Sequence, residues 1–197
     1  MSSKSRNHSS PPKNVQEAEN SKHQGNLLFQ KQKYAAACEL YTEAILQSEQ
    51  KWHVPYLNRA MANEKRLRWK EAKEDLEKCL KLDHDNVKAT YHLGVCVCML
   101  PEEIEDNYKK GAEILEKSLF LAREYDESQV DLIWRSLAKS KYMEHCEKAK
   151  ERRKVYESLE AKLSHPGFVP LTEDDARVLR ERVNEAKEKD ERKQAPD

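Results

Sequence analysis

Small and apolar residues recur along this chain at helical spacing, and one arrangement of them occurs three times. An aromatic residue is followed at i+3 by a small residue, at i+7 by an apolar residue, and at i+10 and i+11 by a small and an apolar residue. The copies are Tyr34-x-x-Ala37-x-x-x-Tyr41-x-x-Ala44-Ile45, Trp69-x-x-Ala72-x-x-x-Leu76-x-x-Cys79-Leu80 and Tyr108-x-x-Gly111-x-x-x-Leu115-x-x-Ser118-Leu119. These offsets keep the residues on one face of a helix. The pattern predicts three copies of a helix-turn-helix unit of about 34 residues.

Each unit is expected to contain two helices. The first helices are predicted over 15–30, 52–67 and 86–100, and the second helices over 34–48, 69–81 and 107–124. A long helix is then predicted over 128–163, with an apolar stripe that covers the last repeat. The stripe consists of Val130, Ile133, Trp134, Leu137 and Ala138.

The sequence divides into four parts on this reading. Residues 1–16 are almost free of apolar side chains and predict a disordered tail. Residues 17–125 hold the three repeats, and 126–163 form the capping helix, which is expected to project from the array once the apolar stripe thins. In 164–197 a break rich in Pro and Gly precedes a short charged helix with Thr172 as N-cap, and then a tail.

Composition agrees with an all-α fold. Only 4 of the 197 residues are Gly and 7 are Pro, too few for the turns of a large sheet. Hydrophobic residues make up 38% and charged residues 37%, which suits a thin helical array in which each element buries one stripe.

Charge and motifs exclude several classes of function. Lys and Arg (36) balance Asp and Glu (36), so we expect no nucleic-acid partner, and we expect no membrane span or signal peptide because no long apolar run occurs. The five cysteines complete no zinc motif and indicate a reducing compartment, the cytoplasm or the nucleus. Phosphate-binding loops and hydrolase motifs are absent, so we expect no enzyme activity, no cofactor and no metal.

The repeated pattern resembles the tetratricopeptide (TPR) repeat over roughly 17–125. The resemblance implies an all-α superhelix of three repeats, with the first helices lining a concave groove. Lys22 and Asn26 lie one turn apart on the first of these helices, Asn58 falls on the second, and Lys88 on the third. Ammonium groups beside amides suit a peptide that ends in a carboxylate.

In TPR co-chaperones that bind acidic chaperone tails, this set is the carboxylate clamp. Its fifth member, usually Arg, falls on His92 here. Phe29, Tyr91 and Leu93 are expected to line an adjoining pocket, with Phe29 shared with the core. The other six histidines, His53 among them, are expected at the surface.

Three stretches, 24–29, 56–60 and 87–94, look most like the TPR half of the CHIP family of U-box ubiquitin ligases, although no U-box follows. The resemblance implies a co-chaperone adaptor that binds the acidic C-terminal tails of 70-kDa and 90-kDa heat-shock chaperones. The alternative is a TPR scaffold that assembles complexes without binding a tail, with dimerisation through the C-terminal helices.

Overall fold

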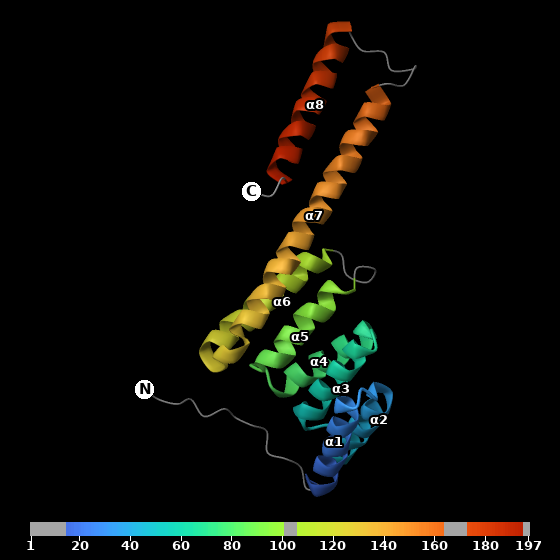
Figure 1. Cartoon of the computed structure of the whole chain (residues 1–197), viewed down its shortest axis with the longest axis vertical. Helices are drawn as coiled ribbons and strands as arrows, with labels where there is room; N and C mark the ends of the chain where they lie inside the picture. The colour runs from blue at the N-terminus through green and yellow to red at the C-terminus, as the bar shows by residue number, and fades with distance from the viewer. Residues whose placement is uncertain (1–14, 101–105, 164–172, 195–197) are drawn as a thin grey trace. The chain divides into compact units, whose positions relative to one another are not determined.

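The computed structural model describes residues 15–100, 106–163 and 173–194, and these residues form helices without strands (Figure 1). The prediction of an all-α chain is therefore confirmed. The helices are α1 (Val15–Gln30), α2 (Tyr34–Gln47), α3 (His53–Lys65), α4 (Trp69–Leu82), α5 (Val87–Cys98), α6 (Asn107–Tyr125), the 3₁₀ turn η1 (Glu127–Gln129), α7 (Val130–Leu163) and α8 (Glu173–Gln194).

The first six helices form three hairpins that stack in chain order (Figure 1). The small residue at the second position of each sequence copy, Ala37, Ala72 or Gly111, is buried. Because these side chains are small, the two helices of each hairpin can approach closely. In addition, α1 contacts α3 and α3 contacts α5, so the first helices of successive repeats form one continuous layer.

The first two hairpins turn the chain in the same way. Gln32 and Leu67 each adopt a left-handed backbone with φ of 58°. In each turn the next amide closes the first helix: Lys33 N donates to Leu28 O, and Arg68 N donates to Asn63 O, both at 2.9 Å. This is the hydrogen-bond pattern of a Schellman C-cap, formed here without glycine.

The start of α7 covers the third hairpin with a narrower stripe than the sequence predicted. Ile133 and Leu137 are buried, and Ser140 donates to the carbonyl of Tyr108 at 2.8 Å. The prediction that Trp134 and Ala138 belong to this covering stripe is wrong, because Trp134 is 56% exposed and Ala138 is also exposed. The contact follows positions 133, 137 and 140, one residue per turn, and Trp134 lies about 100° around the helix from Ile133.

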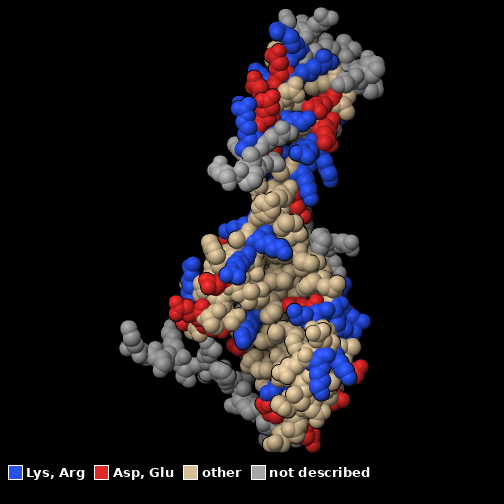
Figure 2. All heavy atoms as spheres, in the orientation of Figure 1, with Lys and Arg blue, Asp and Glu red and all other residues tan. Residues whose placement is uncertain are grey.

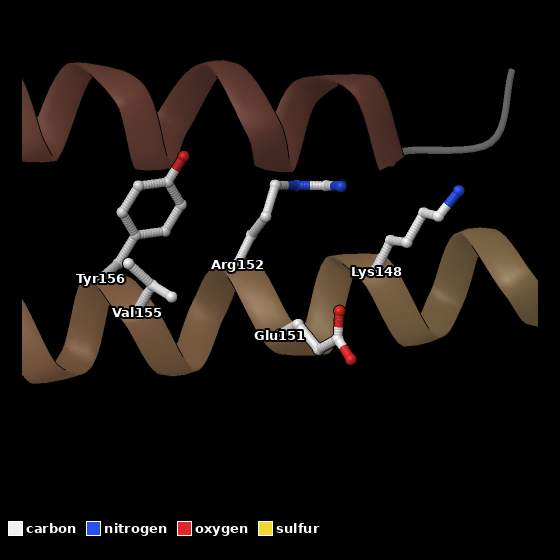
Figure 3. A pocket seen from close by; sticks show the side chains of 5 residues that line it. All are labelled: Lys148, Glu151, Arg152, Val155 and Tyr156. Carbon is white, nitrogen blue, oxygen red and sulfur yellow. The ribbon is translucent and has the colours of Figure 1, made fainter. Parts of the chain in front are cut away.

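The chain divides into two compact units, residues 1–141 and 142–197. In the second unit, α8 pairs with the later part of α7. Arg152 forms an ion pair with Asp190 at 2.8 Å, and Lys187 forms one with Glu160 at 3.1 Å. Figure 3 shows Arg152 and Tyr156 projecting from α7 toward α8. Basic and acidic side chains alternate over this pair, whereas the repeats present broader uncharged areas (Figure 2).

Two predicted segments lie largely outside the described residues: the tail at 1–16, of which Val15 and Gln16 belong to α1, and the break at 164–170. Within the part that the structure describes, no helix has the length and apolarity to cross a membrane.

Candidate functional site

Two asparagines from different repeats meet directly. Asn58 on α3 donates from Nδ2 to Oδ1 of Asn26 on α1 at 3.1 Å. The hydroxyl of Tyr41 donates to the same oxygen at 2.9 Å. With Oδ1 accepting both bonds, the orientation of the Asn26 amide is fixed, and its NH₂ remains a donor.

The buried side chain of Tyr41 holds the pair of Asn26 and Asn58 in place. Its side chain is 2% exposed, and burial raises the pKa of Tyr41 to about 12. The ring lies against the backbone of α1 at Gly25, where a Cβ atom would come within 2.6 Å of Cε1. Gly25 therefore allows the ring to reach the position from which its hydroxyl holds Asn26.

Lys22 lies one turn before Asn26 on α1 and contacts the side chains of Glu19 and Trp52. Its Nζ is 4.9 Å from the centroid of the Trp52 ring and 2.5 Å from Oε2 of Glu19. Trp52 stands at the N-cap position of α3 and is partly buried. Sequence reasoning missed both partners because Trp52 belongs to no repeated position, and Glu19 is one of many charged residues on helix surfaces.

Lys88 and His92 lie one turn apart on α5, whose N-terminus is capped by Asn86 through its Oδ1 and the amide of Ala89 at 2.9 Å. Lys88 is exposed and forms no ion pair with any residue that the structure describes. His92 is different, because its Nδ1 lies 2.9 and 3.0 Å from the two carboxylate oxygens of Glu64 on α3.

Glu64 also accepts a hydrogen bond from Sγ of Cys96 at 3.4 Å, one turn after His92. The side chains of His92 and Glu64 are 17% and 13% exposed. Burial, followed by the charge of Glu64, raises the pKa of the Cys96 thiol. This cluster joins α3 to α5 and holds the His92 ring against the carboxylate of Glu64.

The three residues predicted to line a pocket each pack against a core of the repeats, and all three are half-buried. Phe29 packs edge-on against Tyr34 with ring centroids 5.2 Å apart, in the core of the first hairpin. Leu93 packs against the core that is centred on the second hairpin. Tyr91 packs beside the third core, and its hydroxyl is 3.3 Å from Oγ of Ser136 on α7.

An ion pair that the sequence analysis did not anticipate fixes the residue next to Asn58. Arg59 donates from Nε and Nη2 to the two oxygens of Asp75 on α4 at 2.8 and 2.7 Å, and from Nη1 to Thr42 on α2 at 2.8 Å. The Asp75 side chain is only 5% exposed, and its hydrogen bonds raise the pKa of Arg59. Three helices are thus held together beside the asparagine pair.

One histidine departs from its predicted place. His53 was expected at the surface but is buried, with Nε2 at 3.5 Å from Asp83.

The arrangement thus joins Asn26 to Asn58 by a direct bond, places Lys22 one turn away, and presents Lys88 from the next first helix. Amide and ammonium donors on neighbouring helices can bind carboxylates and backbone carbonyls.

Comparison with known proteins agrees with the repeat pattern, although no protein-family model matches the chain. It is 37% identical over 131 residues to the E3 ubiquitin-protein ligase CHIP of Arabidopsis thaliana, covering 64% of this chain and 44% of the relative. It is 35% identical over 99 residues to the heat shock protein STI1 of Saccharomyces cerevisiae, covering 49% of this chain and 17% of the relative. The chain therefore spans less than half the length of either relative.

A solved structure is similar in fold. The second TPR domain of the human RPAP3 protein, determined in complex with the HSP70 peptide SGPTIEEVD, is 26% identical with a TM-score of 0.56. The match covers 65% of this chain and 98% of that domain. The repeats of this chain are a TPR domain, homologous to the TPR regions of the two relatives.

Proposed function

We propose that this chain is a co-chaperone adaptor whose TPR domain binds the acidic C-terminal tail of 70-kDa and 90-kDa heat-shock chaperones. The observation that carries the proposal is the hydrogen bond between Asn26 and Asn58, with Lys22 and Lys88 on the same layer of first helices. The homology to the TPR regions of CHIP and STI1 and the peptide in the RPAP3 complex support it.

The chemistry of the ligand fits these donors. The peptide SGPTIEEVD ends in Asp, so its last residue carries a side-chain carboxylate and the terminal carboxylate. In this proposal Lys88 and Lys22 bind the carboxylates, and Asn26 and Asn58 donate to the terminal carboxylate and the peptide backbone. His92 supports the site through its pairing with Glu64, and Tyr91 forms the adjacent wall.

We further propose that the TPR domain acts by binding and not by catalysis, in the cytoplasm. By its similarity to CHIP, the adaptor would serve the ubiquitin pathway by presenting chaperone-bound clients, with the helices α7 and α8 providing a dimer contact.

Calorimetric titration of the full chain with SGPTIEEVD tests the proposal. The free acid should bind and the C-terminal amide should bind far more weakly, because amidation removes the terminal charge. Lys88→Ala should weaken binding about ten- to hundredfold, since a charge-assisted hydrogen bond contributes about 1.5–3 kcal/mol. Lys117→Ala, which removes an exposed lysine from α6, is the matched control and should bind normally.

Two results would contradict the proposal. If acid and amide bind equally, the terminal carboxylate is not recognised. If neither binds, the alternative function, a scaffold that assembles complexes without a tail, becomes the better explanation.

A further inference from the structure

We propose that Glu19 is a built-in competitor for Lys22, which an incoming acidic peptide must displace, and that Trp52 keeps the Lys22 ammonium in place during the exchange. This inference rests on the proposed function, because it concerns the regulation of affinity at the same site.

The contacts of Lys22 carry the argument. Its ammonium is already paired with the carboxylate of Glu19, three residues earlier on α1, at 2.5 Å. A carboxylate of the protein therefore already neutralises the charge that the proposed function assigns to a carboxylate of the ligand, and it occupies one of the three donors of this ammonium. A ligand carboxylate at the same ammonium would lie beside the carboxylate of Glu19, and because like charges repel, Glu19 leaves as the peptide binds.

The exposure of the two side chains decides which one moves. The Glu19 side chain is 43% exposed, whereas that of Lys22 is 22% exposed. Glu19 can rotate into solvent, where water replaces the lysine at little cost. Lys22 retains its contact with the face of Trp52, since the ring belongs to the next repeat and does not depend on Glu19.

Glu64, the second acidic residue of the site, differs from Glu19 in its burial and its contacts. Glu64 is 13% exposed and is engaged by His92 and by the thiol of Cys96. Displacing Glu64 would leave these buried polar groups without partners, which is costly. Glu64 therefore stays bound between α3 and α5. Of these two carboxylates, Glu19 is the one that a ligand carboxylate can displace.

Lys88 has no competing ion pair among the described residues, so the two ends of the site differ. A carboxylate can bind Lys88 without displacing another carboxylate. At Lys22 the net binding free energy is only the difference between the ion pair with the ligand and the ion pair with Glu19. The site accordingly binds acidic tails more weakly than its donors would allow, and Glu19 sets this reduction.

Removal of the competitor tests the inference. In calorimetry with free-acid SGPTIEEVD, Glu19→Gln should bind roughly two- to fivefold more tightly than wild type, the range that one exposed ion pair supports. Glu77→Gln is the matched control: it makes the same charge change and breaks an exposed ion pair with Lys73 at 3.2 Å, but on α4. Its affinity should stay at the wild-type value.

Two further variants test the role of Trp52. Trp52→Ala should weaken binding of the free acid, and Trp52→Phe should restore most of it, because Phe keeps an aromatic face for the ammonium. Unchanged affinity in Trp52→Ala would remove Trp52 from the proposal.

The outcomes separate the two proposals. If wild type binds the acid and not the amide, the proposed function stands, and equal affinities of Glu19→Gln and Glu77→Gln overturn the competition alone. If wild type does not bind the acid, the proposed function fails and the competition fails with it.

Discussion

Replacing Gly25 with Ala should destabilise the TPR domain, although helix propensity alone predicts the reverse. Gly25 lies in the middle of α1, where Ala is favoured over Gly by about 1 kcal/mol. The new Cβ, however, would lie 2.6 Å from Cε1 and 2.8 Å from Cδ1 of Tyr41, well inside the contact distance of about 3.5–4.0 Å.

The Tyr41 ring has no free space into which it can move. It is 2% exposed and packs in a cluster with Ala37, Cys38 and Ala62. Overpacking of this kind costs about 1–3 kcal/mol, and the severity of the overlap favours the upper end. Subtracting the propensity gain leaves a net loss of about 2 kcal/mol.

Urea unfolding followed by tryptophan fluorescence measures this loss. The 3 tryptophans, Trp52, Trp69 and Trp134, all lie within residues 1–141, so the signal reports the first unit. A second observable is peptide affinity, which should fall up to about tenfold because displacement of Tyr41 removes its hydrogen bond to Asn26.

A double variant separates sterics from propensity. In a Tyr41→Val background the ring is gone, and Gly25→Ala should become stabilising by about 1 kcal/mol. A stabilising Gly25→Ala in the wild-type background would refute the reasoning.

Three further predictions concern stability and use the same fluorescence assay. Asp75→Asn should cost about 3 kcal/mol, because it leaves the partly buried guanidinium of Arg59 without its counter-charge, and a loss under about 0.5 kcal/mol would show that solvent replaces the carboxylate. The pKa of Tyr41 is raised to about 12 in the folded state, so its contribution is present below pH 10 and is lost as the pH rises to about 12, by on the order of 2 kcal/mol. The urea midpoint should therefore fall more steeply over this range in wild type than in Tyr41→Phe, and parallel curves would contradict this. Leu67→Gly should stabilise by about 1 kcal/mol, because Leu67 has a left-handed backbone and is 71% exposed, and a destabilised variant would show that its side chain packs.

The sequence predicted the helices well because their buried faces repeat. The bounds of α1, 15–30, agree with the prediction, and the other helices of the repeats begin at or within one residue of the expected positions. The ends were less predictable: α3 was expected to reach residue 67 and ends at Lys65, since the left-handed backbone of Leu67 closes the helix. A leucine gives no signal for such a conformation, which usually favours glycine.

The sequence predicted those features of the candidate site that depend on helix geometry. It did not predict which side chains form ion pairs with one another. The four-residue spacing correctly put Lys22 and Asn26 one turn apart, as it did Lys88 and His92. The ion pairs of Lys22 with Glu19 and of His92 with Glu64 follow from side-chain conformation and from contact between helices, which spacing does not encode. Trp134 illustrates the same limit, because a helical stripe does not reveal how many of its residues the neighbouring hairpin can cover.

Among the described residues, α1 belongs to the outermost hairpin of the array, and this position has a thermal consequence. In stacked repeats the outermost unit has one neighbour only, so it opens more readily than the units inside. Lys22 and Asn26 both lie on α1, and each opening of that helix removes their donors while the other repeats stay folded. The fraction of molecules able to bind should thus decline on warming before the domain melts, and an occupied site should in turn hold the first helix closed.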